Sequence, residues 1–307
     1  MLALMLSALV AQGSQSPAVT VPIGAPVDEP SSRWSIHYRP AIAARVNPLG
    51  LFLSGNLSFR YRLYDHESIA LKDNYVGIGP IAFLSPAFGR IGVAAEVQPL
   101  SILNLSASYE FIGFFRAFNF MQSYPSATAE TSDRELSDLK STSYSTYGGM
   151  LTLAAMLQGK VGPIALRSQF RAFLYNMKLR AGDRVFYDSV LDIMSPGNGW
   201  TITDDTDLLY VTTFGLAAGA RYTFTHSFFG ANDFAPGESQ VDPNGPTHRV
   251  GPFFAYTFFD RPDAKHFNTP TLVLLAQWFI QHRYRAGQEV SRGFPWIAVA
   301  FQFKGVL

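Results

Sequence analysis

Cysteine, long apolar runs and a strong net charge are all missing from this chain of 307 residues. Without cysteine the chain can form no disulfide, no thiolate nucleophile and no cysteine-ligated metal site. It has no run of about eighteen apolar residues, so a helix that crosses a membrane is not expected. The formal net charge of +1 indicates no nucleic-acid partner.

The composition that remains suits a protein with lipid on one side and water on the other. Aromatic residues make up 14% of the chain and charged residues only 15%, as expected where one face contacts lipid. No shift in composition and no linker divides the sequence. We therefore expect a single domain over residues 35–307.

The clearest pattern lies at the C-terminal end of the chain. Within residues 271–284 one parity is apolar from Leu272 to Ile280, whereas the other mixes apolar residues with Gln277 and Arg283. After a polar loop at 286–292, the alternation resumes over 297–304. Two strands of about ten residues, each with one apolar and one partly polar face, are typical of a transmembrane β-barrel.

Aromatic residues mark the ends of these two strands. Tyr284, Trp296 and Phe303 lie near strand ends, where amphipathic rings suit a membrane interface, although Trp278 lies nearer the middle. A soluble β-sandwich also alternates and is the alternative fold. The aromatic ends and the polar second face favour the barrel.

The same alternation recurs along the chain. Eleven ranges show it: 36–46, 53–63, 75–83, 90–98, 103–111, 151–157, 164–175, 212–222, 250–259, 271–284 and 297–304. Because bacterial single-chain barrels usually have an even number of strands, we predict about twelve, with ten as the alternative. Either a strand is hidden near Arg184–Ile193, or the glycine-containing range 75–83 is a loop on the rim.

Long polar segments separate some of these ranges. They run from 118 to 146, from 182 to 207 and from 228 to 246, and we interpret all three as extracellular loops. At the N-terminus, an apolar run before Ala11-Gln12-Gly13 predicts a signal peptide over 1–13, and a proline-rich stretch predicts a flexible lead-in over 14–34. A disordered hydrophobic N-terminus is the alternative.

Taken together, these features resemble a bacterial outer-membrane β-barrel at the level of architecture, and no specific family is identified. The resemblance implies an antiparallel up-and-down barrel located in the bacterial outer membrane, with outer-membrane lipid and the barrel-assembly machinery as partners. In that class the last residue is often aromatic, whereas here Phe303 lies four residues before the end. No functional residue is carried over from the resemblance.

The predicted lumen is strongly basic. Ten cations share the inward parity with two carboxylates, a difference of +8: Arg39, Arg45, Arg60, Arg62, Arg90, Arg167, Arg171, Arg221, Arg283 and Lys304 against Glu96 and Glu110. Strand pairing should bring Glu110 to Arg90 as a cross-strand ion pair. A basic wall of this kind favours small anionic solutes. The alternative is that the arginines only brace the barrel.

The segment 182–207 is acidic by contrast. It holds six aspartates against Arg184, a net charge of −5. Asp204, Asp205 and Asp207 supply hard oxygen ligands of the kind that calcium binds, but without the glycine and glutamate of an EF-hand loop. We favour a solvated acidic loop without metal.

No catalytic pattern stands out. The six histidines are scattered, and only His282 attracts interest, because its outward parity near a strand end would place it at the lipid headgroups. No serine on that strand accompanies it, so we predict no enzyme and no cofactor. Two functions remain: a passive channel or transporter for small, preferentially anionic solutes, or a structural or surface-binding protein with a plugged lumen. A lipid-modifying enzyme is a distant third.

Overall fold

A computed structural model of the chain defines residues 33–261 and 265–307. The predicted signal peptide (1–13) and most of the predicted lead-in (14–34) lie outside these described residues. Within the described ranges, no helix has the length and apolar character needed to cross a membrane.

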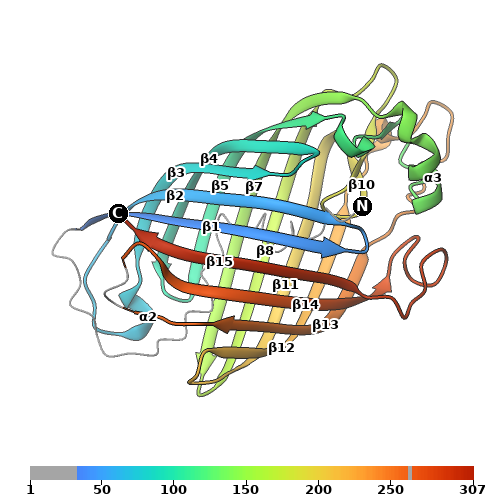
Figure 1. The fold of residues 1–307 in the computed structure, drawn as a ribbon. Coiled ribbons are helices and arrows are strands. Elements are labelled where there is room, and N and C mark those ends of the chain that lie inside the picture. The colour runs from blue at the N-terminus through green and yellow to red at the C-terminus, as the bar shows by residue number, and fades with distance from the viewer. Residues whose placement is uncertain (1–32, 262–264) are drawn as a thin grey trace.

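Twelve antiparallel strands form a closed barrel in which each strand pairs with its neighbours in sequence and β1 pairs with β15 (Figure 1). The barrel strands are β1 (Trp34–Val46), β2 (Gly50–Tyr61), β3 (Tyr75–Leu84), β4 (Phe88–Leu100), β5 (Leu103–Phe115), β7 (Ser145–Val161), β8 (Ile164–Met177), β11 (Asn198–Val211), β12 (Leu216–Ser227), β13 (Thr247–Thr257), β14 (Asn268–Gln281) and β15 (Trp296–Val306). The predicted up-and-down barrel of twelve strands is confirmed, and with it the resemblance to outer-membrane barrels at the level of architecture.

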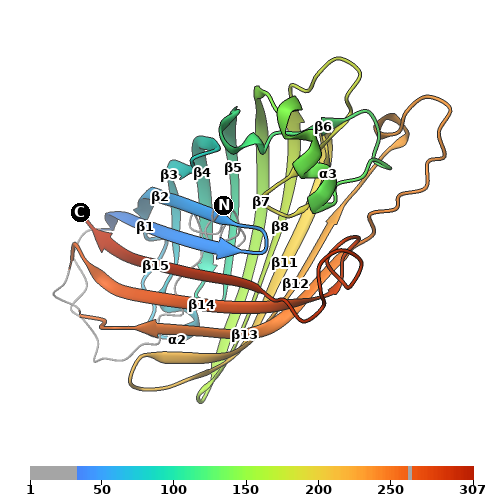
Figure 2. The same cartoon turned by 45° about the vertical axis from the view of Figure 1, so that its right-hand side comes forward.

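The two ends of the barrel differ. At the end that we call the loop end, the connections 116–144, 178–197, 228–246 and 282–295 gather above the strands (Figure 2). At the opposite end, the terminal end, the chain enters β1 and leaves β15, and α2 (Ile69–Lys72) lies in the β2–β3 connection.

Short elements occupy the long connections. They are η2 (Ala117–Asn119), β6 (Ser123–Tyr124), α3 (Asp133–Asp138), η3 (Leu139–Thr142), β9 (Val185–Asp188), β10 (Ile193–Pro196) and η4 (Ala231–Asp233). Strands β6, β9 and β10 form a separate three-stranded sheet. Helix α3 begins where the Ser132 hydroxyl accepts a hydrogen bond from the Glu135 amide.

The predicted parity is confirmed. On β14, Leu272 and Leu274 are 42% and 44% exposed on the outside, whereas Val273 and Leu275 are 6% and 1% exposed on the inside. Outward apolar side chains of this kind find a favourable solvent only in lipid, because water would penalise a continuous apolar band.

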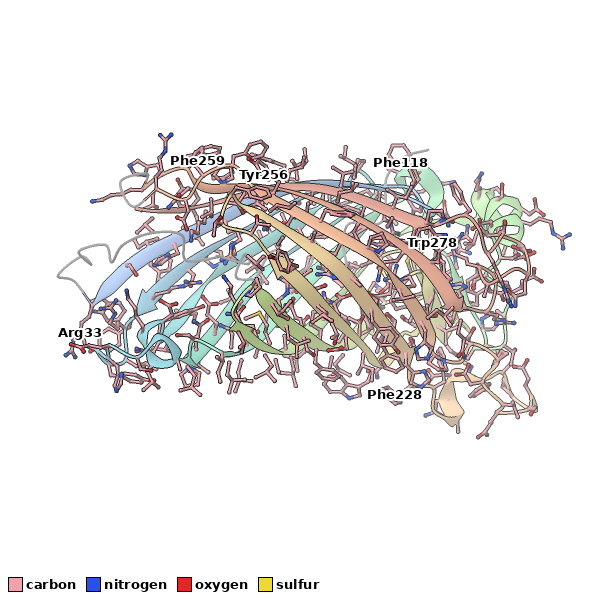
Figure 3. The ribbon with its side chains drawn as sticks, turned by 90° about the horizontal axis from the view of Figure 1, so that it is seen from below. Arg33, Phe118, Phe228, Tyr256, Phe259 and Trp278 are labelled. Atoms are coloured by element: carbon pink, nitrogen blue, oxygen red, sulfur yellow. The ribbon has the colours of Figure 1, made fainter. Side chains whose placement is uncertain are left out.

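Aromatic side chains gather toward both ends of the outer face. Tyr256 and Phe259 lie toward the terminal end, whereas Phe228 and Trp278 lie toward the loop end (Figure 3). Two such girdles are typical of barrels that cross a bilayer, where rings with an apolar body sit at the headgroup level.

Two sequence predictions about individual strands are resolved. Residues 75–84 form the full strand β3, in which Gly79 is required because a Cβ there would lie 1.8 Å from the Leu57 carbonyl oxygen. The suspicion that Arg184–Ile193 hides the twelfth strand is wrong, since β9 and β10 belong to the small sheet. The twelfth strand is β11, in the segment that we interpreted as a loop.

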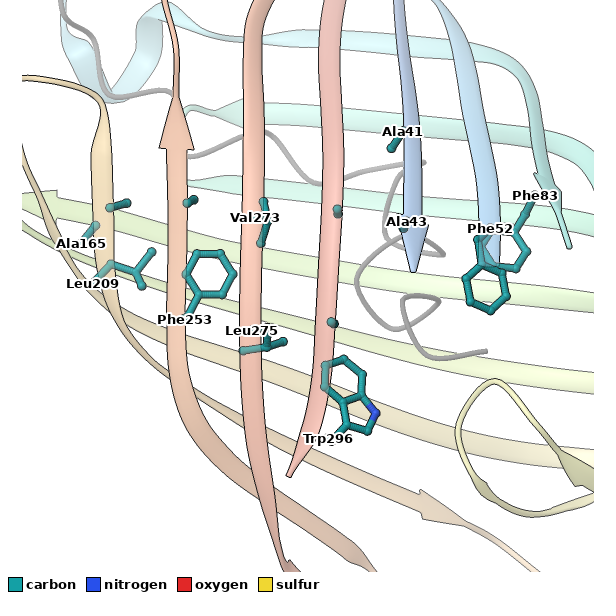
Figure 4. Packing of buried hydrophobic residues seen from close by; sticks show 14 of the residues in the cluster. Ala41, Ala43, Phe52, Phe83, Ala165, Leu209, Phe253, Val273, Leu275 and Trp296 are labelled. Atoms are coloured by element: carbon teal, nitrogen blue, oxygen red, sulfur yellow. The ribbon is translucent and has the colours of Figure 1, made fainter. Parts of the chain in front are cut away.

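Part of the interior is apolar rather than wet. Phe52, Phe83, Phe253 and Trp296 point inward and pack with small residues such as Ala298 (Figure 4). Phe52 and Phe83 stack with ring centroids 5.0 Å apart. Trp296 is only 1% exposed, so its predicted position at the membrane interface is wrong. Phe303 does face outward, where its ring packs against Phe267 at 4.6 Å.

The membrane assignment predicts that an added charge is tolerated on one face only. Val93 faces outward near the middle of β4 and is 53% exposed, whereas Ser106 faces inward on β5 opposite Glu96. We expect Val93→Arg to cost about 2–4 kcal/mol of folding free energy in lipid. Ser106→Arg, the matched control, should cost much less because its side chain faces the polar interior, between Asn104 and Ser108, rather than lipid. Equal costs in denaturant titrations of protein folded in vesicles would contradict the assignment.

Candidate functional site

The barrel interior carries most of the charged side chains that the sequence singles out. Nine cations that are buried or half-buried face inward from the barrel strands, against four carboxylates, a difference of +5: Arg39, Arg45, Arg60, Arg90, Arg167, Arg171, Arg221, Arg249 and Lys304 against Glu96, Glu110, Asp205 and Asp207. The basic excess is therefore present, but smaller than the predicted +8.

Two predicted residues lie beyond the barrel strands. Arg62 follows β2 at the terminal end and pairs with Asp65 at 2.9 Å. Arg283 follows β14 at the loop end, where it donates to the Ala129 and Thr128 carbonyl oxygens and to the Asn244 side chain. Neither side chain belongs to the wall of the barrel strands.

One wall of the interior is held by cross-strand pairs. The Arg90 Nε atom lies 3.2 Å from the Glu110 Oε2 atom, which confirms the predicted ion pair. The Nε–H group does not point at this oxygen, so the contact is an ion pair without a hydrogen bond. Arg60 contacts Glu96 at 3.1 Å. Both carboxylates are nearly inaccessible to solvent, so Glu110 neutralises a positive charge on the adjacent strand and Glu96 neutralises one on β2, beyond the intervening β3.

The opposite wall centres on β11. Asp207 accepts from Arg167 on β8 and from Arg221 on β12, at distances of 2.5–2.9 Å. Asp205 contacts Arg171 at 2.5 Å and also accepts from the Thr223 hydroxyl. All of these side chains are less than 10% exposed, so they form one buried network across three strands.

This network corrects the interpretation of residues 182–207 as a solvated acidic loop. Asp205 and Asp207 point into the barrel and pair with arginines, whereas Asp204 points outward and accepts from the Ser168 and Thr206 hydroxyls. Among the described residues, no group of three or more His, Asp or Glu side chains is arranged to hold a metal ion.

A hairpin made by β9 and β10 enters the loop end of the barrel. At its tip Ser189, Leu191 and Asp192 are buried, and the half-buried Val190 packs against the interior apolar cluster. Arg45 on β1 donates to the Ser189 carbonyl oxygen at 2.5 Å and to the Val190 carbonyl oxygen at 3.1 Å. We call this segment, 185–196, the inserted hairpin.

The tip of the inserted hairpin has its own internal scaffold. The Asp188 carboxylate accepts from the amides of Val190 and Leu191 at 2.7 and 3.1 Å, and from the Tyr175 hydroxyl at 2.6 Å. Asp192 adopts φ 61°, a left-handed conformation that aspartate tolerates better than most residues. Burial raises the pKa of the Asp188 carboxyl despite these donors.

Arg285 fastens the inserted hairpin to the loops around it. Its guanidinium contacts Asp192 at 2.5 Å, Asp133 of α3 at 2.8 Å, and the Asn47 side chain at 3.0 Å. Tyr187 donates to the same Asp192 carboxylate. Burial alone would raise the pKa of Asp192, but the positive charge of Arg285 outweighs it and holds that pKa below its usual value.

His282 completes this junction and is not at the lipid headgroups, which corrects its predicted position. The ring is buried; its Nε2 contacts the Asp192 carbonyl oxygen at 2.8 Å, and its Nδ1 accepts from the amides of Tyr284 and Arg285. These partners require the neutral ring with the proton on Nε2. Tyr284 also lies in this junction, where its hydroxyl accepts from the Thr131 amide.

Several of these residues escaped the sequence reasoning. Arg249 faces inward with its guanidinium 4.6 Å from the Trp296 ring, and its position on the inward parity of β13 would have revealed it. Asp192 and Arg285 lie in loops, where no periodicity indicates burial. The only sequence feature that could indicate their contact is their opposite charge. Many other pairs of loop residues are also oppositely charged, so this feature does not single them out.

No protein-family model matches the chain, and no curated protein matches its sequence. Among solved structures, it is similar to the outer membrane protein Omp33 of Acinetobacter baumannii, with 12% identity, coverage of 90% of this chain and 98% of that chain, and a TM-score of 0.33.

Two further solved structures show the same level of similarity. The translocator domain of autotransporter NalP from Neisseria meningitidis has 8% identity, with 91% of this chain and 89% of that chain covered and a TM-score of 0.36. The toluene transporter TodX of Pseudomonas putida has 8% identity, coverage of 96% and 94%, and a TM-score of 0.35. Because these TM-scores are low, the architecture is assigned from the strand pairing of this chain. The proposal for its function is argued from the interior of the barrel.

The buried network on β11 predicts a large loss of stability when its shared carboxylate is neutralised. Asp207→Asn leaves Arg167 and Arg221 buried without a negative charge, so we expect a loss of about 3–5 kcal/mol in denaturant unfolding. The control Asp65→Asn, whose side chain is 69% exposed, should cost less than about 1 kcal/mol. If both variants lose the same stability, the network is not holding the strands together.

The His282 junction predicts that acid loosens the inserted hairpin. Burial lowers the pKa of His282, with the Asp192 carboxylate opposing that effect, so a released hairpin takes up a proton more readily than a docked one. The docked state therefore loses stability as pH falls through about 6.5, well before Asp192 titrates. Because the chain has no cysteine, Ser189→Cys supplies a single buried thiol whose labelling reports release.

Labelling should rise between about pH 7.5 and about pH 5, relative to the same cysteine in a His282→Gln background. The substituted glutamine side chain would keep a hydrogen-bond donor but cannot titrate, which separates release of the hairpin from the ordinary pH dependence of thiol chemistry. Identical pH profiles in the two backgrounds would show that His282 does not control docking.

Proposed function

We propose that the chain is a channel or transporter of the bacterial outer membrane that passes small solutes and prefers anions. The observation that carries this proposal is the interior charge. A closed barrel with an apolar outside needs no charged side chains within its wall, yet nine cations and four carboxylates face inward. An excess of positive charge along a lumen lowers the barrier for anions.

The preference should come from four of these cations. Five arginines contact the four inward carboxylates, which cancels most of their field. Arg45 instead donates to carbonyl oxygens, Arg249 lies against aromatic rings, and Arg39 and Lys304 contact no carboxylate among the described residues. These four side chains extend from the loop end to the terminal end of the interior.

The inserted hairpin is the natural gate of such a channel. It fills the loop end of the barrel, and it is held there by Arg45, Arg285 and His282. Solute passage through the loop end would require this hairpin to move. Because the hairpin belongs to the small sheet and not to the barrel wall, its movement would leave the strand pairing of the barrel intact.

A second function has an observation in its favour. Arg285 contacts the inserted hairpin, α3 and the β1–β2 turn at one junction. Such a junction is what we expect of a hairpin that plugs the barrel permanently. A structural or surface-binding protein with a plugged lumen would use the loops rather than the interior. The two functions differ in one measurable property, ion conductance.

The deciding measurement is single-channel recording in planar bilayers. We expect Asp192→Asn to raise the open fraction, because it removes the charge that holds Arg285, whereas Asp242→Asn in a neighbouring loop should not. In the Asp192→Asn background, Arg249→Gln should move the reversal potential toward cations. The shift should shrink between about 0.1 M and about 1 M salt, as the Debye length falls from about 10 Å to about 3 Å.

Two results would oppose the proposal. Absence of conductance in both the parent chain and the Asp192→Asn variant would favour the structural alternative. Conductance that prefers cations would leave a channel but reject the role of the basic wall.

A further inference from the structure

Basic side chains gather where β15, β1 and β2 meet near the terminal end of the interior. Gln302 of β15 pairs with Ala41 of β1, and Gly305 pairs with Tyr38, so Lys304 lies beside Arg39 on the adjacent strand. His37 faces the positive charges of Arg39, Arg60 and Lys304. Like charges on adjacent strands repel and destabilise the pairing unless something compensates them.

The nearest inward carboxylate is already fully engaged. Glu96 accepts from Arg60 and from the Ser58 hydroxyl at Oε1, and from the Tyr75 hydroxyl at Oε2. The Arg60 guanidinium also stacks on the Tyr75 ring at 3.9 Å. Arg60 is therefore neutralised in place, and Glu96 has little capacity left for a second cation.

Among the described residues, Arg39 and Lys304 have no carboxylate in contact, and the negative charges of Glu96 and Asp260 act on them only from a distance. Over residues 33–261 and 265–307, neither forms an ion pair, and the Nε atom of Arg39 is buried without a hydrogen-bond partner. A guanidinium and an ammonium taken from water in this way are costly unless an anion joins them. The other inward carboxylates of the barrel strands, Glu110, Asp205 and Asp207, already serve that role for other arginines.

We propose that Arg39 and Lys304, with His37 beside them, form a binding subsite for a carboxylate or phosphate group of a solute. This inference rests on the proposed function and deepens it, since it adds a defined binding site along the path of the anions through the barrel. The planar guanidinium fork suits two oxygens of such a group, and the compact ammonium on the neighbouring strand adds a second point of attraction. The subsite lies at the end of the interior opposite the inserted hairpin.

Calorimetric titration of the refolded full chain in detergent, with succinate and inorganic phosphate as probes, tests the subsite. We expect saturable binding by the parent chain and a loss of affinity of about tenfold or more in Arg39→Gln and in Lys304→Gln, because each removes a charged hydrogen-bonding group. Arg62→Gln is the matched control, since it removes the same charge at the same end, outside the strands. Arg39→Lys should retain part of the affinity.

The outcomes separate the subsite from the channel. No saturable binding by the parent chain, or an equal loss in Arg62→Gln, overturns the subsite. Anion-selective conductance without saturable binding overturns it as well and leaves the proposed function intact. Binding that depends on Arg39 in a barrel that never conducts supports the subsite and rejects the channel. Probe-dependent thermal stabilisation of the parent chain, absent in a folded Arg39→Gln variant, gives a second reading.

Discussion

A buried guanidinium group needs an acceptor or a counter-charge, and the interior of this barrel is organised around that need. Where two arginines flank β11, the strand supplies Asp207 between them. Where Arg45 has no carboxylate in contact, the inserted hairpin offers two carbonyl oxygens instead. Where Arg249 has neither, aromatic rings cover it. The charge pattern of one strand thus dictates what its neighbours must carry.

The same requirement organises the loop end. Arg285 is surrounded by groups from segments far apart in the sequence, and its charge is what makes their convergence favourable. Since several loops share this one side chain, displacement of any of them disturbs the others. A gate built this way would open as a unit, with the hairpin and its surrounding loops moving together.

Much of the architecture follows from local pattern, because strand parity is a property of neighbouring residues. The outward and inward faces of β14 and β15 follow directly from the sequence alternation. Trp296 has the same parity as Ala298 and Ala300, so its inward position was also predictable. Strand β11 was missed because Asp204 and Thr206 interrupt its outward apolar face. Their polarity is tolerated since Ser168 on β8 hydrogen-bonds to Asp204, a contact that only the fold creates.

The candidate site was predictable only in part. The inward arginines follow from parity, but their pairing depends on register, and the register of β8 with β11 follows a long connection. The inserted hairpin could not be foreseen, since its contact between Arg45 and Ser189 joins residues 144 positions apart. Such contacts leave no periodic signal in the sequence.

The closure of the barrel has a consequence for how the chain reaches its native state. Eleven of the twelve strand pairings join consecutive strands of the barrel, whereas β1 and β15 bring together residues such as His37 and Val306 from opposite ends of the described chain. Loop-closure entropy opposes that pairing more than any other. We therefore expect consecutive strands to pair first, before the seam between β1 and β15 closes the barrel. Until then, β1 and β15 are open edges that could pair with another polypeptide, which makes the seam the place where assembly is most exposed to error.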